Sequence, residues 1–329
     1  MIDLLARRNS ILFLTLLIFA SDAVSGNSSI KEALSQGRAY LESGQINQAV
    51  SAFKKAISYD PRCAEAHMLL GYAYRAGGAY ELLGEAKAEL RQALALDPNL
   101  IWARFYLARI YLDLGRLNKA EEQLLQMLQT RPEVPHALSL LGEVNRQLGK
   151  PELSVRHHKR ALEIEPSLVS GHYYLGLAYL DLENDAQALK ELEIASNSPD
   201  AIPEIHISLG SLYLAQGDLD RAVEILKNAI QLDPSRADGH LKLARAYRLK
   251  GQTDLAEKEL QLLLGRENTF LDSPYFQKLR AELYLEMGII REDQGKISEA
   301  RQAYSEALAL YPGYEEARRH LAGLHNRED

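Results

Sequence analysis

Residues 203–236 read PEIHISLGSLYLAQGDLDRAVEILKNAIQLDPSR, and the spacing of their small and large side chains decides the fold. With Pro203 as position 1, small residues fall at positions 8, 20 and 27, and large apolar residues fall at positions 7, 11 and 24. Two antiparallel helices approach closely where small residues face larger ones. Gly217 at position 15 suits the left-handed turn that ends a helix, and Pro234 at position 32 ends the second helix. The segment therefore predicts one helical hairpin.

The same pattern recurs along the chain with a period of 34 residues. The steps from Pro98 to Pro132 and from Pro132 to Pro166 are 34 residues each, and the step from Pro166 to Pro234 is 68. We place eight units, at residues 30–63, 64–100, 101–134, 135–168, 169–202, 203–236, 237–270 and 281–314. The sequence thus predicts a repeat array.

Three departures interrupt the period. The second unit carries three extra residues in its mid-turn, where we expect a protruding loop. An insertion at 271–280 precedes the eighth unit, and it is expected to lengthen a helix or to form a hinge. Residues 315–329 are predicted to form a capping helix and a tail, because a stacked array needs a polar end.

This pattern resembles the tetratricopeptide repeat family. The family signature is met best by Leu209, Gly210, Tyr213, Ala222, Leu226, Ala229 and Pro234. The resemblance implies an all-α fold, a right-handed α-solenoid in which helical hairpins stack into a superhelix with a C-terminal capping helix. It also implies a non-enzymatic role in binding other proteins.

The composition excludes some classes of function. The 329 residues are 47% apolar and 25% charged, which is typical of a folded chain with a large core. The net charge of −7 disfavours a nucleic-acid partner, since phosphate-binding domains carry a clustered basic excess. The single cysteine, Cys63, allows no internal disulfide, and we interpret it as a small buried apolar group.

Residues 1–25 have the layout of a signal peptide or an N-terminal membrane anchor. Arg7 and Arg8 precede the apolar run ILFLTLLIFA, and small residues follow it. The run has ten residues, whereas a span takes roughly 20, so cleavage after Ala23 or Ser25 fits better than a permanent anchor. We therefore expect an exported protein, periplasmic or otherwise extracytoplasmic, that contacts a membrane only through this segment if it stays uncleaved.

No motif for catalysis, a cofactor or a metal is found in the sequence. Four histidines occupy position 4 of their units, namely His67, His172, His206 and His240. Equivalent positions of stacked helices lie about 10 Å apart, too far to share one ion, so we expect these rings to pack between helices. His157 and His158 are neighbours that point to different sides of a helix, and we assign them no function.

The resemblance implies a concave groove lined by positions 2, 5, 9 and 12 of each first helix. In the first three units this predicts an apolar floor set with arginines, formed by Arg38, Met68, Tyr72, Arg75, Trp102, Phe105 and Arg109. Exposed apolar patches mark contact sites, and arginine can hold a carboxylate through paired hydrogen bonds. The alternative is that tight curvature or the N-terminal segment covers this floor. In the later units, Asp238, Glu282, Glu292 and Asp293 predict a more acidic end.

The expected function is that of a scaffold or adaptor that binds a protein or peptide in its groove. The resemblance implies a place in envelope assembly, pilus biogenesis, secretion or polysaccharide export. Two alternatives stay open: an accessory subunit that presents a substrate to a separate glycosyltransferase or peptidase, and a structural scaffold that associates with itself.

Overall fold

A computed structural model describes residues 28–264 and 274–325, and within these ranges the chain is helical, without strands. The expected all-α class of helical hairpins is confirmed. The predicted signal peptide or anchor at 1–25 lies outside the described residues. Among the helices of the described ranges, none is long and apolar enough to cross a membrane.

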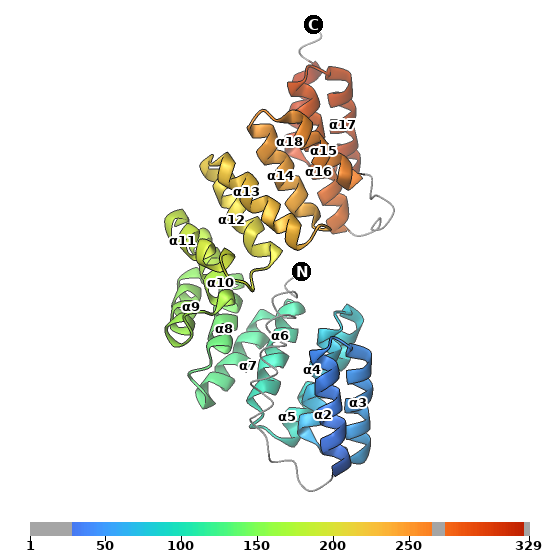
Figure 1. Cartoon of the computed structure of the whole chain (residues 1–329), viewed down its shortest axis with the longest axis vertical. Helices are drawn as coiled ribbons and strands as arrows, with labels where there is room; N and C mark the ends of the chain where they lie inside the picture. Colours follow the sequence, from blue (N-terminus) through green and yellow to red (C-terminus); the bar gives the residue numbers. More distant parts are fainter. Residues whose placement is uncertain (1–27, 265–273, 326–329) are drawn as a thin grey trace. The chain divides into compact units, whose positions relative to one another are not determined.

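The chain divides into two compact units, one running to Ala201 and the other starting at Ile202. The first unit is a series of five hairpins (Figure 1). Their helices are α2 (Ser28–Glu42) and α3 (Ile46–Tyr59), α4 (Ala64–Ala76) and α5 (Leu83–Leu96), α6 (Ile101–Asp113) and α7 (Leu117–Thr130), α8 (Pro135–Gln147) and α9 (Pro151–Ile164), and α10 (Val169–Asp181) and α11 (Asp185–Ser196).

The second unit holds three hairpins and one further helix. They are α12 (Pro203–Gln216) and α13 (Leu219–Leu232), α14 (Ala237–Leu249) and α15 (Thr253–Leu264), α16 (Pro274–Asp293) and α17 (Ile297–Leu310), and α18 (Glu315–His325). Helix α18 packs on α17, and its buried Ala317 and Leu324 join the core around Tyr304. The capping helix predicted after residue 314 is therefore present.

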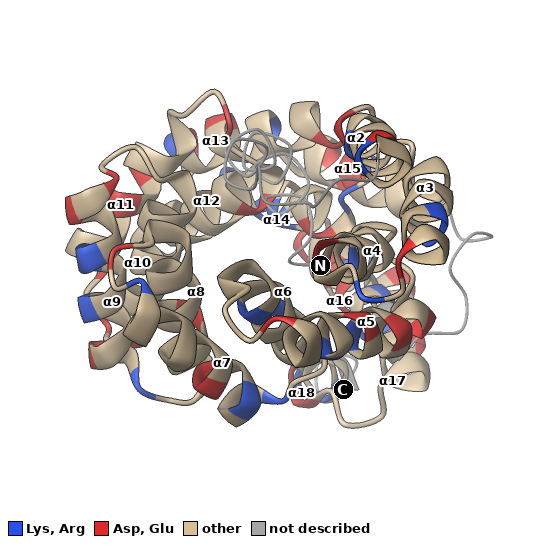
Figure 2. Cartoon of the chain, turned by 90° about the horizontal axis from the view of Figure 1, so that it is seen from below, with Lys and Arg blue, Asp and Glu red and all other residues tan. Residues whose placement is uncertain are grey.

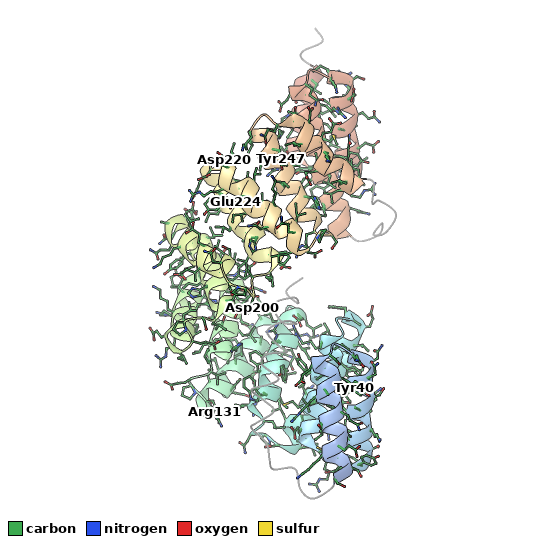
Figure 3. All side chains as sticks on the ribbon, in the orientation of Figure 1. Tyr40, Arg131, Asp200, Asp220, Glu224 and Tyr247 are labelled. Carbon is green, nitrogen blue, oxygen red and sulfur yellow. The ribbon has the colours of Figure 1, made fainter. Side chains whose placement is uncertain are left out.

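Consecutive hairpins stack within each unit in the same way. The second helix of one hairpin packs on the first helix of the next, as α3 does on α4 and α13 on α14. First helices also contact one another, as in the pairs α4 with α6 and α14 with α16. Basic and acidic residues are interspersed along these helices (Figure 2). Figure 3 labels Tyr40 on α2 and Tyr247 on α14, which occupy position 11 of their hairpins.

Close packing inside each hairpin explains the small residue at position 8. A Cβ added to Gly210 would lie 2.6 Å from Leu226 Cγ, and one added to Gly288 would lie 2.4 Å from Tyr304 Cε1. Real Cβ contacts are longer than this, so the facing side chain at position 24 fills the space that the glycine leaves. In these hairpins positions 8 and 24, 16 residues apart in the sequence, are therefore in direct contact.

The turn inside each hairpin uses a left-handed residue at position 15. Gly217 has φ 75°, and six other glycines at equivalent places have φ between 66° and 74°. The fifth hairpin has no glycine there, and Glu183 takes φ 55° instead. Left-handed backbone is unfavourable for a residue with a Cβ, so this turn stores strain that the other turns avoid.

The insertions take two forms. The extra residues of the second unit include a short 3₁₀ helix, Tyr80–Leu82, whose Tyr80 is 68% exposed. Residues 274–280 of the second insertion are helical and lengthen α16, which has 20 residues. This longer helix builds a cavity described below.

Candidate functional site

The predicted groove residues lie on the first helices of three consecutive hairpins. Arg38 is on α2, and the other predicted residues are on α4 (Met68, Tyr72 and Arg75) and on α6 (Trp102, Phe105 and Arg109). The stacking of α4 on α6 brings the aromatic rings of these two helices together. The Tyr72 and Tyr106 rings are 4.8 Å apart, and the Phe105 ring lies 5.6 Å from Tyr106 and 5.7 Å from Trp102.

Four of these residues are not open to solvent in the structure. Met68, Tyr72, Arg75 and Phe105 are each about 5% exposed, which fits the alternative of a covered floor better than an open one. Tyr106, which the sequence analysis did not select, completes the row of rings and is equally buried. Aromatic rings gain more from edge and offset contacts with one another than from water, and stacking supplies those contacts here.

Trp102 and Arg109 remain partly exposed on α6. The Trp102 ring meets Phe105 edge-on at 81°, and the Arg109 guanidinium lies 5.9 Å from the centre of the Phe105 ring. A cation over an aromatic face is held electrostatically by the ring quadrupole. The predicted role of Trp102 and Arg109 in contacting a partner therefore stays a prediction. Both residues lie beside the buried Phe105 ring.

Two of the predicted arginines hold carboxylates of this same chain. Arg38 on α2 pairs with Glu65 on α4, and Arg75 Nε on α4 donates to Asp113 Oδ2 on α6 at 2.7 Å. The pair of Arg75 and Asp113 joins position 12 of one hairpin to position 13 of the next. Arg146 and Asp181 occupy the same two positions in the fourth and fifth hairpins and pair at 3.1 Å. These guanidinium groups link neighbouring first helices, and their predicted role in holding a ligand carboxylate stays a prediction.

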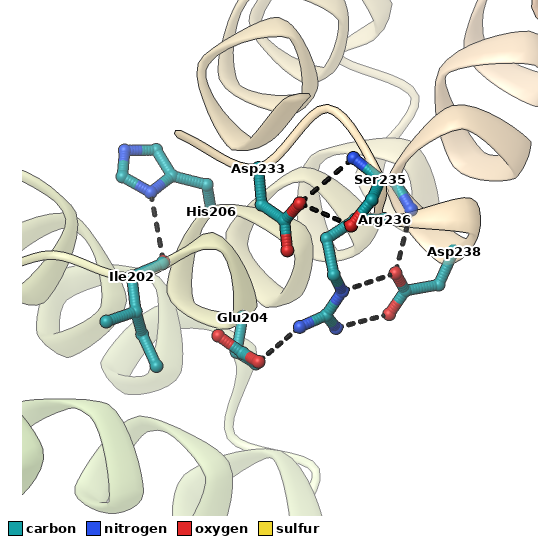
Figure 4. A network of polar contacts seen from close by, with 8 residues as sticks. Ile202, Glu204, His206, Asp233, Ser235, Arg236 and Asp238 are labelled. Carbon is teal, nitrogen blue, oxygen red and sulfur yellow. Dashed lines mark hydrogen bonds and ion pairs between the residues drawn. The ribbon is translucent and has the colours of Figure 1, made fainter. Parts of the chain in front are cut away.

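Two of the four acidic residues at the predicted acidic end of the groove, Asp238 and Glu292, are engaged by side chains of the same chain. Both Asp238 oxygens accept from Arg236, at 2.9 Å and 2.7 Å (Figure 4). Glu292 Oε2 accepts from the Tyr304 hydroxyl at 2.7 Å and lies 3.1 Å from His320 Nδ1. Charge counted along the sequence therefore overstates the acidity that this end offers to a partner.

The histidines at position 4 join three segments of the array. In His67, His172 and His240, Nδ1 lies 2.6–2.7 Å from a glutamate on the second helix of the same hairpin, namely Glu89, Glu191 and Glu259. Nε2 lies 2.9–3.1 Å from the carbonyl oxygen of the proline six residues earlier, in Pro61, Pro166 and Pro234. The expected packing between helices is confirmed, and each ring also ties its hairpin to the preceding turn.

The same position carries other residues elsewhere. Arg104 and Arg318 donate from Nη2 to the carbonyl oxygens of Pro98 and Pro312, at 3.1 Å and 2.7 Å. His206 faces no glutamate, and its Nδ1 lies 3.3 Å from the Ile202 carbonyl oxygen. A hydrogen-bonding side chain at position 4 is thus a structural device of this chain. No group of three or more metal-ligating side chains occurs in the described ranges.

His172 shows the electrostatic consequence of this arrangement. Both of its ring nitrogens face acceptor oxygens, and only the doubly protonated imidazolium donates to both. The hydrogen bond to Glu191 accordingly raises the pKa of His172. The protonated form of His172 is therefore favoured by folding and stabilises the contact between α10 and α11.

The fourth hairpin has a polar interior that the sequence analysis missed. His158 at position 24 is 0% exposed and stands where other hairpins have leucine or an aromatic residue. Its Nδ1 lies 3.3 Å from Ser139 Oγ, and its ring stacks on Tyr174 at 6.0 Å. Within the described residues, His158 Nε2, Ser154 Oγ and Asn145 Oδ1 have no hydrogen-bond partner.

Burial makes this histidine a neutral group. Desolvation, with repulsion from His157 and Arg146, lowers the pKa of His158 to about 3. Desolvation also lowers the pKa of His136 to about 4, on the first helix of the same hairpin. The Ser139 and His158 pair is not a catalytic dyad, because neither side chain reaches solvent and a substrate has no access to them.

Cys63 is the buried residue that immediately precedes α4 in the sequence, and burial raises the pKa of its thiol. A thiol of raised pKa carries little thiolate near neutral pH and is a poor nucleophile. The expectation of a small buried group is confirmed.

Helices α14 and α16 line a cavity of about 220 Å³ in the second unit, which is open to solvent on one side. It is lined by Asp238, Leu241, Lys242 and Arg245 from α14 and by Lys278, Leu279 and Glu282 from α16. Only Asp238 and Glu282 of these residues were selected from the sequence, as acidic groove positions. The cavity was missed because Lys278 and Leu279 lie in the insertion, outside the repeat register.

Comparison with known families supports the repeat register. Family models described as tetratricopeptide repeat match residues 83–144 and 213–283, residues 34–101, and residues 281–314. Together these matches cover most of the described chain.

Curated relatives match only in part. Superkiller complex protein 3 of Homo sapiens is 31% identical over 120 residues, which is 36% of this chain and 8% of that protein. Protein O-mannosyl-transferase TMTC3 of Homo sapiens is 26% identical over 170 residues, which is 47% of this chain and 18% of that protein. The chain therefore spans less than a fifth of the length of these two relatives.

A solved structure matches nearly the whole chain. The superposition on a chain of the APC/C hetero-tetramer Cut9-Hcn1 covers 96% of this chain and 58% of the matched chain. The TM-score is 0.66 and the sequence identity is 16%. At this identity the likeness concerns the fold alone.

Proposed function

Because the chain belongs to the tetratricopeptide repeat family, we propose that it is a non-enzymatic scaffold that binds a protein or peptide on the first helices of its hairpins. Proteins built of these repeats commonly bind protein or peptide partners and are generally not enzymes. The observation that carries the proposal is the partly exposed Trp102 beside Arg109, supported from below by the buried rings of Phe105 and Tyr106. Tryptophan and arginine are the side chains most often found at binding hot spots.

The test is capture of a native partner by crosslinking and mass spectrometry, with a variant that carries Trp102→Ala and Arg109→Ala. We expect partner capture to be lost while the unfolding temperature falls only modestly, because Trp102 is partly exposed. Leu125→Ala is the matched control, since Leu125 is a 46% exposed apolar residue on the second helix α7. Unchanged capture by the double variant, or equal loss in the control, would contradict the proposal.

We further propose that the protein is exported and acts in envelope assembly, pilus biogenesis, secretion or polysaccharide export. The support is the layout of residues 1–25, with two arginines before a short apolar run and small residues after it. N-terminal sequencing of the native protein should find a mature end near Val24 or Gly26. Recovery of intact Met1 from a cytosolic fraction would refute export.

A second candidate is an accessory subunit that presents a substrate to a separate glycosyltransferase. It is favoured by the partial likeness to a protein named as an O-mannosyl-transferase. Co-purification of transferase activity with the native protein would support it. The third candidate is a structural scaffold that associates with itself. Light scattering on the mature protein would give it the molar mass of a defined oligomer.

A further inference from the structure

The cavity between α14 and α16 owes its shape to the insertion before the eighth unit. Lys278 and Leu279 precede residue 281, where that unit starts, and they lie in the added turns of α16. Across the cavity, α14 contributes Leu241 and Lys242. The lining therefore combines a first-helix face with residues that the repeat pattern does not supply.

Two of the charged lining residues are engaged within the protein. Asp238 accepts two hydrogen bonds from Arg236, and its Oδ1 also accepts from the Gly239 backbone N–H at 3.1 Å (Figure 4). Arg245 Nε donates to Glu286 Oε1 at 2.5 Å, and Glu286, whose side chain is 1% exposed, also accepts from Arg248 Nε at 3.1 Å. Asp238 and Arg245 therefore shape the cavity while each is engaged by a group of the chain.

Lys242 and Lys278 are different. Within the described residues, neither ammonium group has an ion pair or a hydrogen bond to a side chain. Lys242 is partly buried, and desolvation followed by repulsion from Arg245 lowers its pKa. Glu282 and Asp238 only partly oppose these effects. An anion placed between the two ammonium groups would therefore gain energy that no group of the chain supplies.

The apolar part of the lining limits the kind of anion. Leu241 and Leu279, at 7% and 9% exposure, line the same cavity as the two lysines. Glu282 in the lining disfavours a dianion such as a phosphate group, and a single carboxylate suits the remaining charge. A carboxylate with an aliphatic neighbour matches both parts of the lining.

We propose that this cavity binds an acidic segment of a partner polypeptide, with one carboxylate between Lys242 and Lys278 and an aliphatic side chain on Leu241 and Leu279. The inference rests on the proposed scaffold function and names the chemistry of one contact. The site is separate from Trp102 and lies wholly in the second unit, so the two can be tested independently.

The test is fluorescence anisotropy of the full chain with a panel of labelled, amidated nonapeptides in which one to three glutamates alternate with leucines. Matched panels replace each glutamate by glutamine or by lysine. We expect glutamate peptides to saturate below 1 mM, and about tenfold weaker binding for the glutamine peptides. Binding should also weaken as salt rises, because the contact is partly exposed.

The decisive variant carries Lys242→Gln and Lys278→Gln, and it should lose about tenfold or more in affinity for the glutamate peptides. Lys250→Gln is the control, since Lys250 follows the last residue of α14 as its C-cap but pairs with Asp220 of α13. Urea unfolding shows whether each variant keeps its fold. As a second readout, a bound glutamate peptide should protect the Lys242 amine from acetic anhydride, detected by mass spectrometry.

Equal binding of glutamate and glutamine peptides, or full binding by the double lysine variant, would overturn the proposal. Absence of saturation by every glutamate peptide would overturn it as well, as would binding of inorganic phosphate with no binding of peptide. Each of these results leaves the capture experiment with the Trp102 variant untouched, so failure of this site is distinguishable from failure of the scaffold function.

Discussion

Replacing His158 by leucine should stabilise the protein and make it less sensitive to acid. Leucine fills position 24 in the second, third, fifth, sixth and seventh hairpins, and in the second, fifth and sixth it lies against the glycine at position 8. His158 occupies the same place in the fourth hairpin, where a Cβ added to Gly142 would lie only 2.6 Å from His158 Nε2. Leucine is of similar size, so the change swaps polarity rather than volume.

The expected gain at neutral pH is about 0–2 kcal/mol. Removing the unsatisfied His158 Nε2 relieves a desolvation penalty of about 1–3 kcal/mol. Against this, the Ser139 hydroxyl loses its 3.3 Å contact with Nδ1, which is worth about 1 kcal/mol. The double variant with Ser139→Ala should therefore recover most of that loss.

The effect grows as the pH falls. The unfolded chain takes up a proton at the ordinary histidine pKa of 6.5, while the folded state resists protonation until about pH 3. The stability that depends on a neutral His158 is thus present above pH 6.5 and is lost as the pH falls towards 3. At about 1.4 kcal/mol per pH unit, this costs the folded state about 3 kcal/mol by pH 4.5.

The assay is urea unfolding followed by circular dichroism at pH 7.5 and at pH 4.5. The His158→Leu midpoint should exceed that of the wild type at both pH values, and by more at pH 4.5. The reciprocal variant Leu192→His places a histidine at position 24 of the fifth hairpin and should show the opposite behaviour. A His158→Leu variant that is less stable than the wild type at pH 4.5 would refute the reasoning.

Three further substitutions should each raise or lower the free energy of unfolding in the same assay. Gly288→Ala should destabilise by about 1–3 kcal/mol, because its Cβ would lie 2.4 Å from the rigid Tyr304 ring; no loss would contradict the packing argument. Glu183→Gly should stabilise by about 1 kcal/mol through relief of left-handed strain, and a loss would show that the side chain matters more. Glu191→Gln removes the negative charge of the group whose hydrogen bond raises the pKa of His172, so it should destabilise more at pH 5.5 than at pH 8.5. The stability from this contact is present below pH 6.5 and is lost as the pH rises through the folded-state pKa, so an equal loss at both pH values would contradict this sign.

The hairpins could be predicted from the sequence because their packing is local and periodic. The small residue at position 8 and the large one at position 24 meet inside a single hairpin, so the spacing within one unit is enough to find them. The burial of His158 followed from the same register. It was missed because the adjacent His157 and His158 were considered as a pair rather than by their positions in the unit.

The groove was harder to predict because its surface depends on contacts between hairpins. Whether Arg75 faces solvent depends on Asp113, which is supplied by the next first helix at a different position of the unit. The ring contact of Tyr72 likewise depends on Tyr106. Contacts of this kind require the offset between stacked hairpins, and a count of positions along one helix does not contain it.

The polar interior of the fourth hairpin also bears on how the first unit comes apart. In a stacked array each hairpin is held mainly by its neighbours, and the ends usually fray first. Here Ser154, His158 and Asn145 weaken a hairpin that has neighbours on both sides. In acid, therefore, the first bonds to become available to a protease should lie in the middle of the array, and cleavage there would release folded pieces from either side.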